Sequence, residues 1–120
     1  MVRRSVQAPD DELGLMPGTL DLFILKTLSW GPMHGLSILQ WIERTSQRRQ
    51  QVEEGALYPA LHRMEGKGWL EAEWGHTDAG RRAKYYRLTR EGRKQLATKV
   101  ARWSAYTEIV ALILSAKEAG

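Results

Sequence analysis

The densest group of chemically capable side chains in this 120-residue sequence is a basic stretch between residues 81 and 102. It contains one acidic residue, Glu91, and nine cationic residues: Arg81, Arg82, Lys84, Arg87, Arg90, Arg93, Lys94, Lys99 and Arg102. Its net charge is +8, whereas the rest of the chain has a net charge of −4. Clustered cations attract phosphate-rich polyanions. Charge alone predicts a polyanion partner and a merely solvated basic surface about equally well.

Residues for other kinds of chemistry are sparse. The chain has no cysteine, which excludes disulfides, zinc–thiolate sites and thiol nucleophiles. Its three histidines, His34, His62 and His76, fall in different predicted elements, and no metalloprotease, P-loop or serine-hydrolase motif occurs. Glu71 and Glu73 alternate with apolar residues, as the solvent side of a strand does. We therefore predict a protein that is not an enzyme, with no metal site and no cofactor.

Length and composition predict one domain with one core. The longest unbroken apolar run covers residues 109–114, whereas a membrane-spanning helix needs roughly 20 apolar residues. The N-terminus lacks the apolar core of a secretion signal. We therefore expect a cytoplasmic protein that does not contact a membrane.

Three helices are predicted from apolar residues at helical spacing. The first covers residues 20–29, with Thr19 as its N-cap, the second covers about 35–45, and the third covers about 54–67. Leu57, Leu61 and Met64 give the third helix a narrow apolar face.

The apolar period then changes from 3.6 to 2 in residues 69–74 and 84–88, on either side of a run of turn-forming residues at 75–80. This pattern predicts a β-hairpin with a long loop. A final helix is predicted to start after Thr89 as N-cap and to continue to about residue 116.

Three helices followed by a hairpin are typical of a winged helix-turn-helix, in which the third helix enters the DNA major groove and the hairpin is the wing. The predicted fold class is therefore mainly α with a small antiparallel β-hairpin. Residues 1–16 are predicted to be a flexible N-terminal arm, residues 17–88 the DNA-binding domain, and residues 89–120 a C-terminal dimerisation helix.

The final helix carries an apolar seam with the 4-3 spacing of a coiled coil, in which Thr107 is one polar position. The predicted dimer contacts are Leu96, Val100, Trp103, Tyr106, Val110, Ile113 and Leu114. The stripe is longer than a compact DNA-binding body can cover. We therefore expect a second copy of the chain to cover it.

Three motifs resemble those of the PadR family of transcriptional regulators. Residues 55–65, GALYPALHRME, resemble the family's GTLYPALHRLE signature, and residues 31–35, GPMHG, resemble its GPLHGY helix connection. Residues 80–89, GRRAKYYRLT, resemble its second wing strand, GRRRKYYRLT. The short C-terminal segment resembles the subgroup that dimerises through one long helix. Ala56 stands where the family usually has Thr and Leu36 where it commonly has an aromatic residue, which leaves the DNA sequence recognised unpredictable.

The resemblance implies a homodimeric repressor that binds a palindromic operator in double-stranded DNA and leaves it when a small aromatic or hydrophobic effector binds. Together with the basic residues of the third helix and the wing, it predicts a set of DNA-binding residues. They are Tyr58, Pro59, His62, Arg63, Lys67, Arg81, Arg82 and Lys84.

Simpler alternatives stay open at several of these positions. Tyr58 could pack against the second helix, His62 could be an ordinary surface residue, and the wing cations could be merely solvated. Tyr85 could stack beside DNA or serve only as a cross-strand partner. Trp103 is expected either to pack in the dimer or to stack on a flat effector, as a Trp at this spacing does in multidrug-sensing relatives.

Two other functions are compatible with the same patterns. One is a winged-helix module that binds another protein instead of DNA, and the basic stretch argues against it. The other is a DNA-binding dimer without any response to a small molecule.

Overall fold

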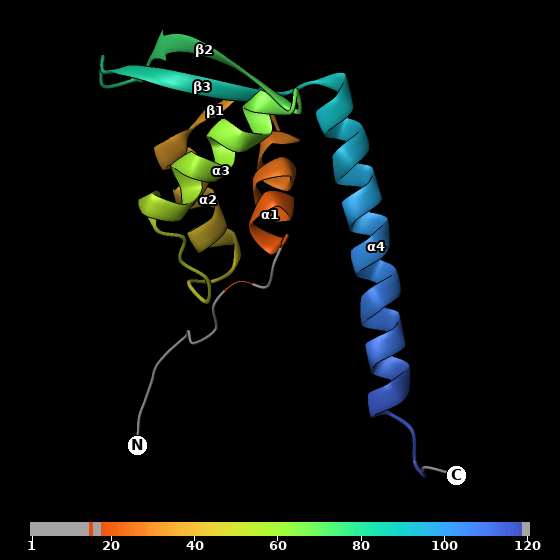
Figure 1. Ribbon diagram of the computed structural model, residues 1–120. Coiled ribbons are helices and arrows are strands. Elements are labelled where there is room, and N and C mark those ends of the chain that lie inside the picture. The colour runs from red at the N-terminus through yellow and green to blue at the C-terminus, as the bar shows by residue number, and fades with distance from the viewer. Residues whose placement is uncertain (1–14, 16–17, 119–120) are drawn as a thin grey trace.

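The computed structural model describes residue 15 and residues 18–118, so the predicted arm over residues 1–16 lies outside the described residues apart from Leu15. The elements follow the predicted order of helices, hairpin and final helix (Figure 1). They are α1 (Thr19–Leu28), β1 (Met33–His34), α2 (Gly35–Thr45), α3 (Glu54–Gly66), β2 (Leu70–His76), β3 (Arg82–Leu88) and α4 (Arg90–Leu114). The predicted winged helix-turn-helix with a long C-terminal helix is confirmed.

The three short helices and the proximal part of the sheet share one apolar core. Burial of these side chains is the dominant favourable term for a body of this size. The core contains Ile24, Leu25 and Leu28 from α1, Ile38 and Ile42 from α2, Leu57, Ala60, Leu61 and Met64 from α3, and Leu70, Tyr86 and Leu88 from the sheet. The face predicted for the third helix is therefore the face that it buries.

The sheet has one strand more than the sequence predicted. Its order is β1-β3-β2 with antiparallel pairing, and β1 adds Met33 opposite Tyr86. The two residues of β1 are too few to show a period in the sequence. The hairpin strands are also longer than predicted, because pairing continues outward to His76 opposite Arg82 and leaves a tighter loop over residues 77–81.

The two predicted helix caps have different outcomes. Thr89 caps α4 as predicted, since its Oγ1 accepts a hydrogen bond of 3.0 Å from the backbone N–H of Gly92. The prediction for Thr19 was wrong, because the N-cap of α1 is Gly18, which has a φ of 86° and makes no side-chain cap. A glycine adopts that left-handed backbone without the cost that a side chain would add.

Helix α4 starts at the base of the wing and is fastened there by backbone contacts. The Thr89 N–H and hydroxyl both donate to the carbonyl oxygen of Trp69, at 3.0 Å each. Gly92 passes so close to that same carbonyl that a Cβ atom at this position would collide with it. The direction in which α4 leaves the body is therefore fixed by close backbone packing.

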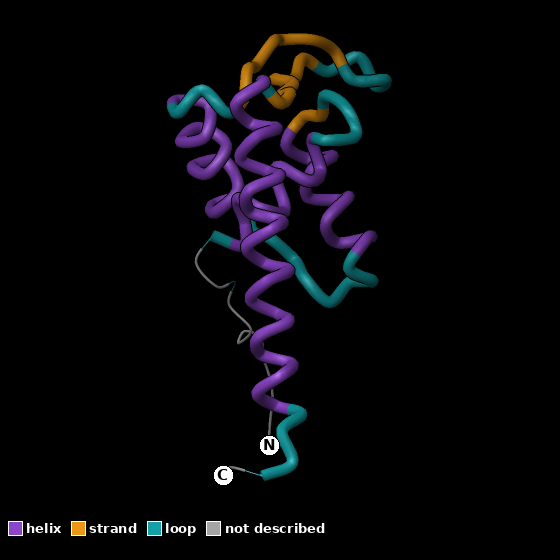
Figure 2. The backbone as a smooth tube through the Cα atoms, turned by 90° about the vertical axis from the view of Figure 1, so that its right-hand side faces the viewer, coloured by secondary structure: helices purple, strands orange, loops and turns teal. Residues whose placement is uncertain are grey.

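Beyond its first turns, α4 extends away from the body as a single rod (Figures 1 and 2). Its 25 residues span about 38 Å at 1.5 Å per residue. It packs against α1 and β3, and Leu96 is half-buried against the core of its own chain. Further along, the apolar side chains are exposed, reaching 71% for Ile113 and 78% for Leu114. None of the described helices combines the length and the apolarity that crossing a membrane would require.

Candidate nucleic-acid interface

The solvent-facing side of α3 is opposite its four core residues, and Pro59 and His62 are exposed there. Helix α3 lies below the wing, with α2 behind it (Figure 1). This is the arrangement in which a winged helix-turn-helix presents its recognition helix to the major groove. The predicted DNA-binding residues divide into three groups around this helix, and their surroundings differ.

Tyr58 packs against the second helix while keeping an exposed edge. A Cβ atom at Gly35 would lie 2.5 Å from the Tyr58 hydroxyl oxygen and 2.7 Å from its ring, so the ring occupies the space that this glycine leaves. Burial, followed by the charges of Glu54 and Tyr86, raises the pKa of Tyr58 above its usual value of 10.0. Like any tyrosine hydroxyl at neutral pH, this one is protonated and can donate a hydrogen bond. Packing of Tyr58 on α2 is observed, and its contact with DNA stays a prediction.

Arg63 joins α3 to α1, although its side chain remains 46% exposed. Its guanidinium donates two hydrogen bonds to the carboxylate of Asp21, at 2.7 and 2.9 Å. The Asp21 hydrogen bond raises the pKa of Arg63, and Asp21 itself is buried. Contact of Arg63 with a base would leave that buried carboxylate without its partner, which is costly. The predicted DNA contact at Arg63 stays a prediction, and the pairing favours a structural role.

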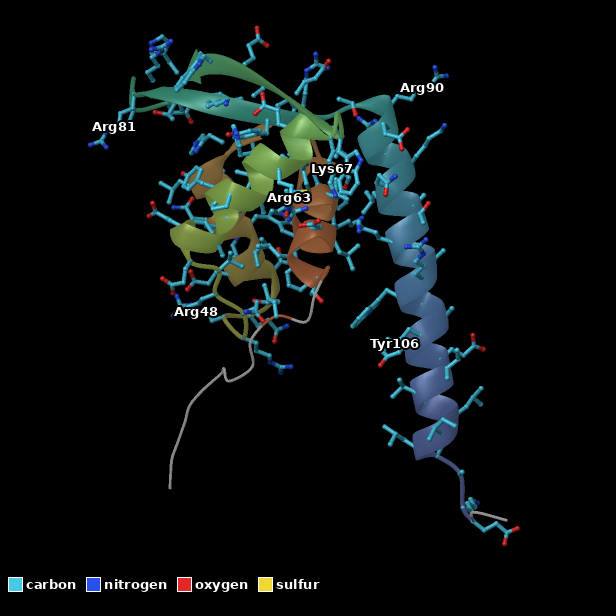
Figure 3. The ribbon with its side chains drawn as sticks, viewed as in Figure 1. Arg48, Arg63, Lys67, Arg81, Arg90 and Tyr106 are labelled. Carbon is cyan, nitrogen blue, oxygen red and sulfur yellow. The ribbon has the colours of Figure 1, made fainter. Side chains whose placement is uncertain are left out.

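Lys67 also lies on the side of α3 that faces α1 and α4 (Figure 3). Its Nζ is 4.8 Å from the centre of the Trp69 ring, and the Nζ of Lys99 from α4 is 5.5 Å from the same ring. Such cation–π contacts contribute about 0.5–1 kcal/mol at exposed sites. Lys67 therefore belongs to the junction between the body and α4, away from the wing tip.

The wing tip is a defined turn that presents its arginines outward. The N–H of Gly80 donates to the carbonyl of Thr77 at 2.8 Å, and the N–H of Thr77 donates to the carbonyl of Arg81 at 2.8 Å. The Arg81 N–H also donates to the Thr77 hydroxyl at 3.2 Å. The Arg81 side chain is exposed at the far end of the wing (Figure 3). A fixed turn lowers the entropy that a phosphate contact would otherwise cost.

The remaining wing cations lie over aromatic rings. The Arg82 guanidinium carbon is 4.3 Å from the centre of the Trp74 ring, and Trp74 is 56% exposed. Lys84 points back to α3, with its Nζ 3.4 Å from a Glu65 carboxylate oxygen and 5.5 Å from the Tyr86 ring centre. The structure thus brings Arg81 and Arg82 together at the distal wing, whereas Lys84, two residues further along β3, is directed toward Glu65 of α3.

Two functional partners were missed by the sequence analysis. Asp21 is a single acid within an apolar helix, and such a residue needs a cationic partner when it is buried. Trp74 falls in the predicted strand over residues 69–74, but the core ends before it and Arg82 lies over its ring. Only the full length of the hairpin could have revealed that pair.

A groove between α1 and α4 contains the residue predicted to bind an effector. It has a volume of about 360 Å³ and is lined by Gly18, Thr19, Leu22, Lys99, Arg102, Trp103 and Tyr106. The Trp103 and Tyr106 ring centres are 6.1 Å apart. This volume is at the lower end of the range for small-molecule sites. Among the described residues, no cluster of three or more acidic or histidine side chains is placed to hold a metal ion.

This geometry defines a class, the winged-helix DNA-binding regulators. Residues 24–98 match the transcriptional regulator PadR-like family, and the chain belongs to that family, whose members are regulators of transcription rather than enzymes. The chain is 39% identical to the transcriptional regulator Rv3488 of Mycobacterium tuberculosis over 62% of this chain and 66% of that protein. It is 32% identical to an uncharacterized protein of Lysinibacillus sphaericus, over 87% of this chain and 95% of the other.

A solved structure is similar over the same region. The crystal structure of a PadR family transcription regulator from Clostridium difficile superimposes with a TM-score of 0.72 at 29% identity. The similarity covers 82% of this chain and all of that chain. The resemblance noted in the three sequence motifs is therefore confirmed.

Proposed function

We propose that this chain is a homodimeric repressor that binds a palindromic operator and releases it when a small aromatic or hydrophobic compound binds. The observation that carries the proposal is the uncovered apolar side of α4. Val100, Val110 and Leu114 are exposed at seam spacing on a helix that extends beyond its own body. A second α4 would bury them, as the two strands of a coiled coil bury their seams.

Dimerisation through α4 gives the DNA-binding surface its symmetry. Two bodies held at the ends of paired helices present two copies of α3, which fit half-sites about one helical turn apart. Tyr58, Pro59 and His62 are the α3 residues proposed to face the groove, and Arg81 and Arg82 are the wing residues proposed to contact phosphates. Occupation of a promoter by such a dimer blocks transcription without any further surface.

The groove between α1 and α4 supports the effector part of the proposal. Trp103 and Tyr106 offer aromatic faces in a site of suitable volume, and α1 is also joined to α3 through Asp21 and Arg63. A compound that separates α1 from α4 would therefore displace α1, and α1 is bound to the recognition helix α3.

The deciding experiment is the sequencing of duplexes that the protein retains from a random pool. We expect a palindrome whose half-sites are about 10 base pairs apart. A set of retained duplexes without two-fold symmetry would contradict the dimer, and failure to retain duplex DNA would contradict the function.

The wing provides the second test. The triple variant Arg81→Ala/Arg82→Ala/Lys84→Ala should lower affinity for operator and random duplex alike. The slope of log affinity against log salt should fall by about one per lost contact and subunit. An unchanged slope would remove the wing from the interface.

A further inference from the structure

A second basic surface lies where α2 ends and the chain turns toward α3. It consists of Arg44, Arg48 and Arg49, and we refer to it as the basic loop. All three side chains are exposed, and none of their guanidinium groups forms an ion pair or a hydrogen bond with any residue that the structure describes. No acidic residue occurs between positions 44 and 52. The surface therefore carries three cations without an assigned partner.

Two local hydrogen bonds close the backbone of the basic loop. The Arg48 N–H donates to the carbonyl of Glu43 at 2.8 Å, and the Ser46 hydroxyl oxygen accepts from the Gln50 N–H at 3.1 Å. Gln47 and Arg48 have φ angles of 57° and 65°, in the left-handed region where glycine is usual at a helix C-terminus. Two successive side-chain-bearing residues in this region are strained, and strain of this kind is concentrated at functional sites.

The position of the loop relative to α3 indicates its partner. Figure 3 shows Arg81 at the wing tip and Arg48 at the opposite end of the body, with α3 between them. A helix in the major groove lies between two sugar-phosphate backbones, because that groove is about 12 Å wide. The wing accounts for cations on one side of α3. The basic loop supplies them on the other side. The α3 cations cannot take this place, because Arg63 is bound to Asp21 and Lys67 lies over Trp69 at the junction with α4.

We propose that the basic loop binds the DNA phosphate backbone on the side of the major groove away from the wing, so that each α3 is clamped from both ends. This inference rests on the proposed DNA-binding function. Three neighbouring carboxylates limit its strength. Glu53 and Glu54 begin the next helix, while Glu43 accepts a hydrogen bond from the Gln51 side chain at 3.2 Å. We therefore expect one or two phosphate contacts per subunit.

The test compares two variants that remove the same charge. Arg48→Ala/Arg49→Ala changes the basic loop, and Arg93→Ala/Lys94→Ala changes the exposed first turns of α4, on a helix that leads away from α3. Affinity for the selected operator and for random duplex is measured over a range of salt concentrations. The loop variant should lose about one unit of salt slope per contact and subunit, and the α4 variant should keep the wild-type slope.

Hydroxyl-radical footprinting locates the lost contacts. The loop variant should lose protection on one flank of each half-site, and Arg81→Ala/Arg82→Ala should lose it on the other flank. Arg48→Lys/Arg49→Lys, which keeps both charges, should restore the slope. A variant that has the same thermal unfolding temperature as the wild type is still folded, so its loss of slope reflects a lost contact.

The outcomes separate this inference from the function on which it rests. If the wild-type protein fails to bind duplex DNA, the proposed function is wrong. If the wild type binds with a steep slope and the loop variant keeps that slope, only the clamp is wrong. Equal losses in the loop and α4 variants would also overturn it, since they would indicate a general effect of net charge.

Discussion

The body of this protein buries its large apolar side chains, whereas its C-terminal helix exposes them. From α1 to β3, the large aliphatic side chains converge on one core, and Ile24, Leu25, Ile38 and Leu57 have no exposed surface. Along α4 beyond Leu96, every side chain is exposed except that of Lys99, although apolar residues recur at seam spacing. We therefore expect the body to be stable as one chain, and the proposed dimer would cover the distal half of α4.

The difference also separates two kinds of contact with DNA. Contacts made by the body depend on the fold of one chain and act on each half-site alone. In the proposed dimer, the relation between half-sites depends on α4, because a rigid link between two bodies is needed to hold them in register. Variants in the two regions should therefore fail in different ways.

The largest effect should come from a charge in the seam. Val110→Asp or Leu114→Asp would bury a carboxylate without a partner between two helices, which costs more than the interface can tolerate. We expect a monomer by analytical ultracentrifugation and a loss of operator affinity of at least a hundredfold, since two half-sites are no longer bound together.

Ala105→Asp is the matched control, because position 105 lies on the opposite side of α4 from the seam. It should remain a dimer. A Val110→Asp protein that still sediments as a dimer, or an Ala105→Asp protein that does not, would contradict the proposed interface.

A smaller effect should come from the contact between α1 and α3. Arg63→Ala leaves the buried Asp21 carboxylate without its two hydrogen bonds, and we expect the free energy of unfolding to fall by about 1–3 kcal/mol. The measurement is urea denaturation. In the double variant Asp21→Asn/Arg63→Ala, much of this loss should be recovered because no unpaired charge remains.

The single variant Arg63→Ala distinguishes the structural role of Arg63 from a role in base recognition. A structural role predicts lower stability and equal losses of affinity on operator and random duplex. Unchanged stability combined with altered preference at particular base pairs would assign Arg63 to base recognition instead.

The sequence predicted most of this fold because its strongest signals are local. The apolar stripe of α3, the change of period at the hairpin and the Thr89 cap each depend on neighbouring residues. Asp21 and Arg63 lie 42 positions apart on two different helices, so no local sequence pattern predicts their pairing. The same reason explains the missed strand β1, which exists only because β3 lies beside it.

The site was predicted less completely than the fold. The sequence does not distinguish the basic residues of the third helix from one another, but the turn of the helix directs Arg63 and Lys67 toward α1 and α4. The sequence of the basic loop contains no recognisable motif, because its arginines form part of the proposed interface only through their position relative to α3.

A third prediction concerns the groove between α1 and α4. Trp103→Ala should leave a dimer that binds DNA but should reduce affinity for a flat aromatic compound roughly tenfold, because a stacking face is lost. Lys99 and Arg102 also line the groove, so a planar aromatic carboxylate should bind more tightly than a planar cationic dye.

Calorimetry with both compounds is the measurement, and Trp30→Ala is the control because Trp30 is exposed far from the groove lining. Equal affinity in the wild type and Trp103→Ala would leave Trp103 as a packing residue. If the wild type binds neither compound, the proposed response to an aromatic effector is wrong, and the proposal reduces to a DNA-binding dimer.

The smallest effect should occur within the body, at the strained end of α2. Gln47 has a φ of 57°, where a residue with a Cβ atom is disfavoured by roughly 1 kcal/mol and glycine is not. Gln47→Gly should therefore raise the free energy of unfolding by up to about 1 kcal/mol, reduced by the greater freedom of glycine in the unfolded chain. Gln50→Gly is the control, because Gln50 is not among the positive-φ residues and should gain nothing. Urea denaturation measures the free energy of unfolding of both variants.

Since neither variant changes charge, the salt slope of DNA binding should stay at the wild-type value if the loop keeps its conformation. A Gln47→Gly protein that is less stable than the wild type would show that the left-handed turn, and with it the placement of Arg48, is not the conformation of the loop in solution.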